Sequence, residues 1–235
     1  LPELHLFGLD ISITKHVIFM WIAVALLVVI FKLVSNGYKK SIIPKGLTNL
    51  VEVLVVFVRD EIARPTIGKG FEKFLPYLLT VFFFILTCNF LGLLPYGATA
   101  TSNIAVTATL AVISFLFIQV GGMMQNGVFG YFKGLLPHGL PAWLLPIMLV
   151  VELLGLFTKP FALAIRLFAN MTAGHIVILA LLGLIFILQT YVVVPVSVAF
   201  ALFIYLLEIL VSLIQAYIFT MLSSLFIGMA VHQEH

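Results

Sequence analysis

A single charge interrupts a long apolar run in the second half of this chain. Arg166 is the one Asp, Glu, Lys or Arg between Lys159 and Glu208. A charge at the centre of a membrane helix costs from ~2.5 kcal/mol on insertion scales to above ~10 kcal/mol in simulations, so an arginine here indicates a functional site. Two plainer interpretations compete: a side chain that reaches back to a membrane interface, and half of a buried structural ion pair. The apolar residues on both sides of Arg166 favour the functional interpretation.

Polar residues in this run and in the next one recur at helical spacing. Four of them fall on roughly one face of an ideal helix: Glu152, Lys159, Arg166 and Asn170. A second set is spaced by three and four residues, which also gives one helix face: Tyr205, Glu208, Ser212 and Gln215. If these two polar faces oppose each other, they would form a water-accessible path between the helices. Glu208 also has a plainer interpretation, as a neutral packed carboxylic acid.

The composition predicts an integral membrane protein. Apolar residues make up 63% of the 235 positions and charged residues 9%, against roughly 45–50% and 25% in soluble domains. Eight of the twelve basic residues lie between Lys32 and Lys73. This places that segment on the cytoplasmic side, so the net charge of +3 does not indicate a nucleic-acid partner. A lone cysteine, Cys88, excludes an internal disulfide. The chain begins at Leu1 without Met, which indicates a leading segment that was cleaved or is not represented.

Apolar stretches long enough to cross ~30 Å of hydrocarbon alternate with polar segments. The segment 45–64 carries too many charges to cross, so we expect an amphipathic helix that lies on the cytoplasmic surface or packs on the bundle, and that ends before Pro65. The third span, 104–120, is expected to be closed by a run of glycine and amide residues: Gly121, Gly122, Gln125, Asn126, Gly127 and Gly130. The predicted fold is an all-α integral membrane protein, a single domain over 1–235, with an external N-terminus and about five transmembrane helices. The spans are 17–34, the hairpin 74–94 and 104–120, and two long tilted helices at 147–189 and 196–230.

The last two segments are longer than a membrane is thick. The 48 residues from 147 to 194 would extend roughly 70 Å as one helix, more than twice the hydrocarbon thickness. They form either two spans broken at Thr172-Ala173-Gly174 or one strongly tilted helix, and the same ambiguity recurs after Pro195. Two spans would put Arg166 beside a turn at an interface, whereas one tilted helix holds it inside. The matched lengths favour a tilted hairpin.

Two motifs carry a resemblance to a known family. One is KPFALAIRLFANMTAGH (159–175), with Arg-Leu-Phe-x-Asn-Met, and the other is LLEILVSLIQAYIFTML (206–222), with Gln-Ala-Tyr-Ile-Phe. With these motifs in this order, the chain resembles the a subunit of F-type ATP synthases, a stator component of the membrane sector. The segments NFLGLLP and MAVHQEH are compatible, so the resemblance runs from about residue 74 to the end. The first seventy residues agree in layout.

The resemblance implies a function and a set of site residues. Two long helices would curve against a rotating ring of c subunits, each with a membrane-embedded carboxylate. Protons would pass to and from the ring through two offset half-channels, coupling proton-motive force to ATP synthesis elsewhere in the complex. Arg166 would be the essential stator arginine. The positions that match the proton path are His175, Glu208, Asn170, Gln215 and Glu152.

These five positions take different roles by the same resemblance. Asn170 and Gln215 match polar positions close to the arginine, and Glu152 matches an acid of the cytoplasmic half-channel. His175 and Glu208 match a pair that lines the half-channel open to the proton-rich side. Many bacterial members carry the two residue types exchanged, and the order here resembles mitochondrial members. Since a histidine and a carboxylate can share a proton from either helix, we expect the two side chains to meet.

The implied partners are the c-subunit ring, peripheral-stalk b-type subunits, the F1 sector indirectly, and the lipid bilayer. No nucleic acid, cofactor or metal is expected, and the chain would be non-catalytic by itself. It would lie in an energy-coupling membrane, of a bacterium or alternatively of an organelle. The alternative is a stand-alone secondary transporter in which Arg166 binds an anionic substrate, but the inverted repeats typical of that class are not visible. The C-terminal HQEH lacks the His-Glu-x-x-His order and is interpreted as a solvated tail.

Overall fold

Five helices in the described part of the chain are long and apolar enough to cross a membrane. The computed structural model describes residues 5–6, 9–10, 14–40, 45–94, 99–127, 130–131 and 145–232. Its long helices are α1 (Lys15–Lys40), α4 (Leu75–Leu93), α5 (Ile104–Asn126), α7 (Leu145–Leu188) and α8 (Val193–Val231). They confirm the all-α membrane class. Two short strands, β1 (His5–Leu6) and β2 (Leu9–Asp10), pair antiparallel before α1. Most of the HQEH tail, residues 233–235, lies outside the described residues.

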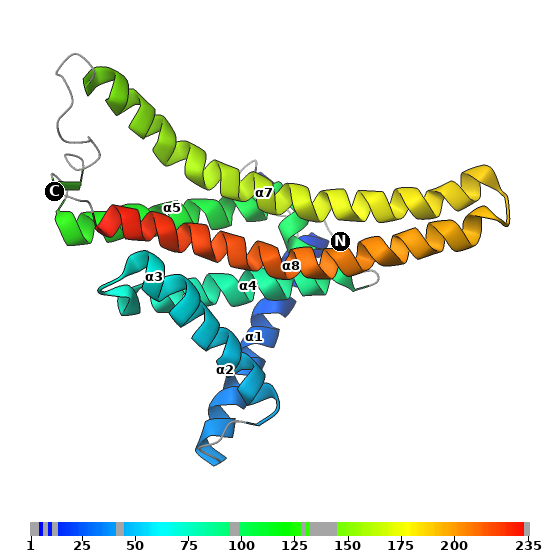
Figure 1. The fold of residues 1–235 in the computed structure, drawn as a ribbon, viewed down its shortest axis with the longest axis horizontal. Helices are drawn as coiled ribbons and strands as arrows, with labels where there is room; N and C mark the ends of the chain where they lie inside the picture. The colour runs from blue at the N-terminus through cyan, green and yellow to red at the C-terminus, as the bar shows by residue number, and fades with distance from the viewer. Residues whose placement is uncertain are drawn as a thin grey trace.

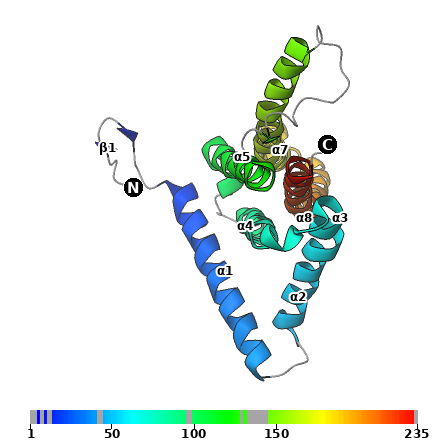
Figure 2. The same cartoon turned by 90° about the vertical axis from the view of Figure 1, so that its left-hand side faces the viewer.

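Four of the long helices form a bundle, and α1 and α2 (Leu47–Phe57) extend from it. Helices α4, α5 and α8 run alongside one another, and α7 packs on α5 and α8 (Figure 1). Helices α1 and α2 project from the bundle as the two limbs of a V that has α4 at its open end (Figure 2). Helix α1 therefore crosses the direction of the other long helices instead of running parallel to them.

Helix α7 is continuous over 44 residues. The break considered at Thr172-Ala173-Gly174 does not occur, because a helix interior satisfies every backbone polar group without water. The N-terminal half of α7 bends away from α8 (Figure 1). Pro160 lies in that half, and a proline inside a helix removes one hydrogen bond and kinks it. A short turn then leads into α8, with Gln189 at a φ of 46°, so α7 and α8 form an antiparallel hairpin.

The amphipathic segment extends further than the sequence predicts. After α2 the chain makes a π-helical turn, η1 (Val58–Ala63), and continues as α3 (Arg64–Ile67). The expected stop at Pro65 is wrong, because the helical turns continue through this proline to Ile67. Val58 and Ile62 are fully buried. This half of the segment packs on α4 and α8.

Helix α5 is longer than the predicted span 104–120, and it ends among the residues expected to close that span. Helix α5 continues to Asn126, with Gly121 and Gly122 buried inside it. A Cβ on Gly122 would collide with the Tyr131 ring and would lie 3.0 Å from the Ala230 carbonyl oxygen. The glycines therefore allow close packing here, and they do not end the helix. Asn126 donates from Nδ2 to the Ala230 carbonyl at 3.0 Å, which joins the end of α5 to the end of α8.

Candidate functional site: a polar seam between the last two helices

Three polar contacts follow one another along the antiparallel α7–α8 hairpin. Lys159 Nζ lies 5.2 Å from the centre of the Phe226 ring. Further along α7, Asn170 donates from Nδ2 to Gln215 Oε1 at 2.8 Å. The third contact joins His175 Nδ1 and Glu208 Oε1 at 3.3 Å. Because the α7 positions rise as the α8 positions fall, these contacts form one seam of the hairpin.

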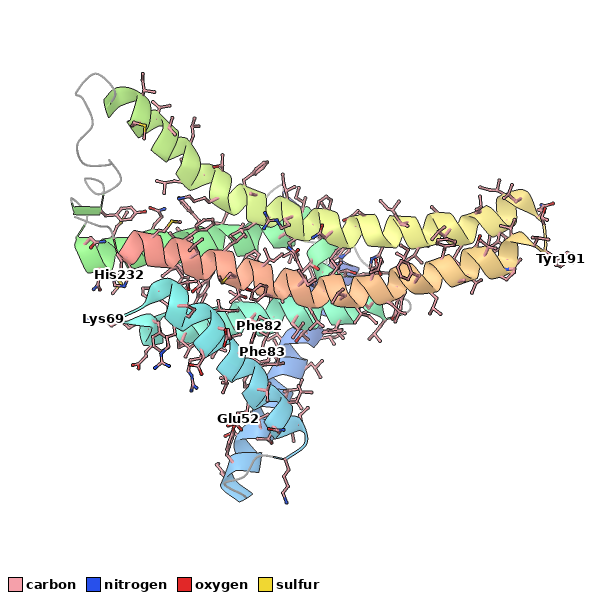
Figure 3. The ribbon with its side chains drawn as sticks, in the orientation of Figure 1. Glu52, Lys69, Phe82, Phe83, Tyr191 and His232 are labelled. Atoms are coloured by element: carbon pink, nitrogen blue, oxygen red, sulfur yellow. The ribbon has the colours of Figure 1, made fainter. Side chains whose placement is uncertain are left out.

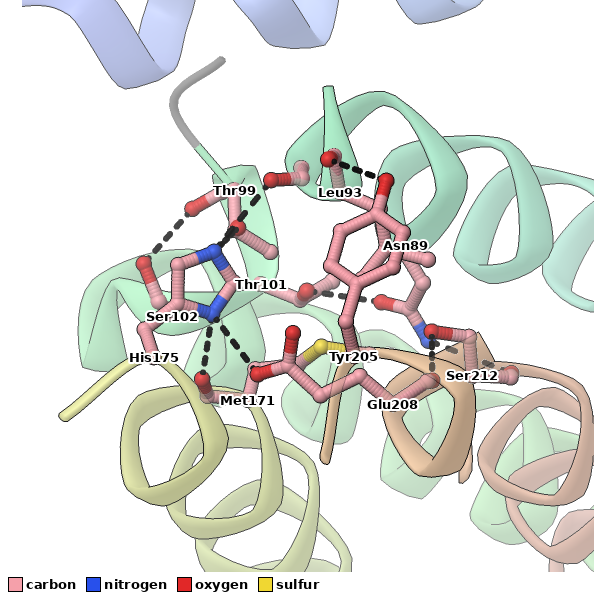
Figure 4. Close-up of polar contacts among 11 residues, drawn as sticks. Asn89, Leu93, Thr99, Thr101, Ser102, Met171, His175, Tyr205, Glu208 and Ser212 are labelled. Atoms are coloured by element: carbon pink, nitrogen blue, oxygen red, sulfur yellow. Dashed lines mark hydrogen bonds and ion pairs between the residues drawn. The ribbon is translucent and has the colours of Figure 1, made fainter. Parts of the chain in front are cut away.

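The predicted meeting of His175 and Glu208 is confirmed by this distance. Figure 4 shows the imidazole between the Glu208 carboxylate on one side and the end of α4 on the other. Nδ1 also lies 3.0 Å from the Met171 carbonyl oxygen, and Nε2 lies 3.2 Å from the Gly92 carbonyl oxygen. Both ring nitrogens thus face acceptors, an arrangement that a doubly protonated imidazole satisfies at each end.

Glu208 is buried, with 7% of its surface exposed. Its carboxylate lies against Gly174, where an added Cβ would collide with Oε1. A side chain at position 174 would therefore force the carboxylate away from His175. The backbone carbonyl of Glu208 accepts a hydrogen bond from Ser212 Oγ at 2.8 Å. Glycine on α7 thus provides the space in which the acid of α8 sits.

Residues from α4 and the segment after it complete this end of the seam. Thr99 Oγ1 lies 3.4 Å from His175 Nε2, and Tyr205 donates to the Leu93 carbonyl at 2.9 Å. Nearby, Thr101 donates to Asn89 Oδ1 at 2.7 Å. Asn89 Nδ2 in turn donates to the Ser212 carbonyl at 3.4 Å, which joins α4 to α8. The parts played by Gly92 and Thr99 were not predicted.

Arg166 lies apart from these contacts. It is exposed, and within the described part of the chain no side chain forms a hydrogen bond or ion pair with it. Three exposed alanines surround it, at positions four before, three after and seven after: Ala162, Ala169 and Ala173. At 100° per residue all three lie within about 60° of Arg166 around the helix. The guanidinium thus stands in a flat strip of small residues.

The remaining predicted residues differ in how far their side chains are buried. Gln215 is buried, whereas its partner Asn170 is exposed on the same side of α7 as Arg166. Glu152 belongs to α7, but its side chain lies outside the described residues. The structure therefore brings together His175 with Glu208 and Asn170 with Gln215, and it leaves Arg166 unpartnered within its described part.

The fold and this seam define a class: a multi-pass helical membrane protein with isolated ionisable groups on a long helical hairpin. Comparison with known proteins gives the family. Residues 17–228 match the family described as ATP synthase A chain. The chain belongs to this family, and its function is proton translocation in an F-type ATP synthase. The alternative of a stand-alone transporter has no support.

Curated relatives from bacteria agree with this assignment. The chain is 59% identical to ATP synthase subunit a of Chloroherpeton thalassium over 240 residues, which cover 100% of this chain and 72% of the relative. It is 57% identical to ATP synthase subunit a 2 of Chlorobaculum tepidum over 98% of this chain and 66% of the relative. It is 54% identical to ATP synthase subunit a of Myxococcus xanthus, over 97% of this chain and 75% of the relative. The chain is a multi-pass membrane protein of bacterial type and a subunit of a larger complex.

Proposed function

We propose that the strip around Arg166 is the stator surface that faces a ring of c subunits. The observation that carries this proposal is an exposed arginine, without a partner in the described structure, among three exposed alanines of a helix long enough to span the membrane. Small residues allow a second helix to approach closely within a bilayer. A ring carboxylate passing there would meet a fixed positive charge, which favours its ionised form and lowers its proton affinity.

His175 and Glu208 form the proton path on the outer side in this proposal. Their distance of 3.3 Å permits direct proton exchange between an imidazole and a carboxylate. The pair lies beside the C-terminal end of α4, and the basic segment before α4 assigns that end to the outside by the positive-inside rule. Protons would enter near Thr99, pass to the pair, and continue along the seam.

The Asn170–Gln215 bond continues this path towards Arg166. Along α7, Asn170 lies four residues from Arg166 and five from His175, so each step is about 6–8 Å at 1.5 Å per residue. Amide groups donate and accept hydrogen bonds but hold no net charge. The amides of Asn170 and Gln215 can therefore hold water molecules or hydrogen bonds in the path without adding a charge beside the arginine. Glu152, 14 positions before Arg166 and about 21 Å away on an ideal helix, would serve the cytoplasmic half-channel.

The proposal requires the last two helices to be strongly tilted. Helix α8 has 39 residues and a length of about 58 Å, so it fits ~30 Å of hydrocarbon when inclined by roughly 60°. Helix α1, with 26 residues, has the length of an ordinary span and crosses the direction of α8 (Figure 1). An orientation with α1 near the membrane normal satisfies both lengths.

Peripheral-stalk b-type subunits and, indirectly, the F1 sector are the further partners of this proposal, in an energy-coupling plasma membrane. Each proton that crosses 100 mV releases about 2.3 kcal/mol, so several protons per turn are needed to drive ATP synthesis. The chain would conduct protons and perform no catalysis itself.

Single cysteines test the ring-facing surface. Ala162→Cys and Ala169→Cys should each form a disulfide with a cysteine placed beside the ring carboxylate in the intact complex. Phe161→Cys is the matched control, because Phe161 is also exposed, at 66%, but points about 140° away from Arg166 around an ideal helix. Cross-linking at Phe161 with none at the two alanines would overturn the proposed surface.

A further inference from the structure

A cavity of about 300 Å³ opens where η2 (Phe71–Lys73) and the ends of α5 and α8 come together. Two lysines, Lys69 and Lys73, and the amide of Gln125 provide its polar lining, and the rest is mainly apolar, including Phe117 and Val120. No Asp or Glu of the described chain lines it. The cavity therefore joins positive charge to apolar surface.

A tight turn positions Lys69, one of the residues that line this cavity. Gly68 and Gly70 on either side have φ angles of 72° and 87°, which glycine adopts without strain. His232 Nε2 lies 3.3 Å from the Lys69 carbonyl oxygen, so the end of α8 reaches this turn. Figure 3 shows the two residues at the same end of the bundle. Both lysines belong to the basic segment that the positive-inside rule assigns to the cytoplasmic surface.

An apolar groove continues from the cavity along α4 and α5. A second cavity of about 460 Å³ shares Lys73 and Phe117 with the first and runs past Thr80 and Phe84 to Ile113. From Lys73 to Phe84 the helix rises about 16 Å, so the groove follows α4 for about three helical turns. Val120 (52%), Phe117 (44%) and Ile113 (39%) leave this side of α5 exposed.

We propose that this groove is a binding site for an anionic phospholipid of the cytoplasmic leaflet. The lipid phosphate lies between the Lys69 and Lys73 ammonium groups, and one acyl chain fills the groove between α4 and α5. Charge complementarity selects the headgroup, since basic pockets between membrane helices attract anionic lipids.

Photoreactive lipids in vesicles around the intact complex test this site. Phosphatidylglycerol and phosphatidylcholine, each with a diazirine in one acyl chain, are compared for adducts mapped to residues 73–84 and 110–120. In the wild-type complex we expect the anionic lipid to label these segments roughly tenfold more than the zwitterionic one, since each lysine favours an anionic surface. Equal labelling by the two lipids, or labelling of neither, overturns the proposal without any variant.

Variants then assign the selectivity to the two lysines. In the double variant Lys69→Gln, Lys73→Gln, labelling by phosphatidylglycerol should fall to the phosphatidylcholine level. The matched control, Lys32→Gln with Lys39→Gln, removes the same charge from α1 and should leave labelling unchanged. An equal loss in both variants would indicate a general surface potential and contradict the site. Displacement of the lipid by millimolar inorganic phosphate would show a free-anion site instead. A photoreactive residue at position 120 that captures another subunit would show a protein occupant.

Discussion

His175 Nδ1 lies 3.3 Å from Glu208 Oε1 across the α7–α8 hairpin. The same imidazole presents Nε2 to the Gly92 carbonyl at 3.2 Å, so one side chain connects α7 to both α8 and α4. An ionisable group between a buried acid and the end of another helix is suited to receive a proton from one side and release it to the other.

If the pair acts as a unit, its two residue types are interchangeable. Glu208→His and His175→Glu should each slow proton conduction through the membrane sector freed of its F1 part. The double exchange should recover much of the lost rate, because it restores one imidazole and one carboxylate in contact. Conduction by the double variant no faster than by the slower single one would show that the residues act separately.

Gly174 provides the space for the Glu208 carboxylate, so a methyl group there should disturb the pair. We expect Gly174→Ala to lower proton conduction several-fold while ATP hydrolysis stays coupled, since Arg166 is untouched. Gly183→Ala is the control, because nothing lies within 4 Å of a Cβ at that glycine of the same helix. Equal conduction by both variants would mean that Glu208 has room to move without loss of function.

The topology can be tested with single cysteines in a Cys88→Ser background. Lys39, at the end of α1, should be inaccessible to an impermeant thiol reagent added outside intact cells, because the basic segment faces the cytoplasm. Gln189, at the turn between α7 and α8, should react. Labelling at position 39 from outside, with none at 189, would reverse the orientation.

Part of this structure followed from the sequence because isolated polar residues in apolar runs have few explanations. The apolar helices of the fold were predicted from composition and length, and the contact between His175 and Glu208 from their isolation in apolar runs together with the family resemblance. The hydrogen-bonding partners Gly92 and Thr99 could not be, because a backbone carbonyl and an ordinary hydroxyl leave no periodic signal. The role of Gly174 does leave a sequence signal. A glycine next to an ionisable residue in a helix indicates that a side chain of another helix approaches closely there.

Two helices extend further than the sequence predicts. Pro65, Gly121 and Gly122 were expected to close helices because these residue types disfavour helix interiors in water. Pro65 instead lies within continuous helical turns, just after the π-helical turn η1. Gly121 and Gly122 lie inside α5, where they allow side chains from elsewhere in the fold to approach the backbone.

Arg166→Ala tests the central claim most directly. The variant complex should assemble normally, yet membrane vesicles that contain it should show neither ATP-driven proton pumping nor ATP synthesis above background, because no fixed charge remains to release the proton of the ring carboxylate. Arg64→Ala, which removes a guanidinium that is 68% exposed outside the spans, should retain both activities. ATP synthesis at the wild-type rate in Arg166→Ala would contradict the proposed mechanism.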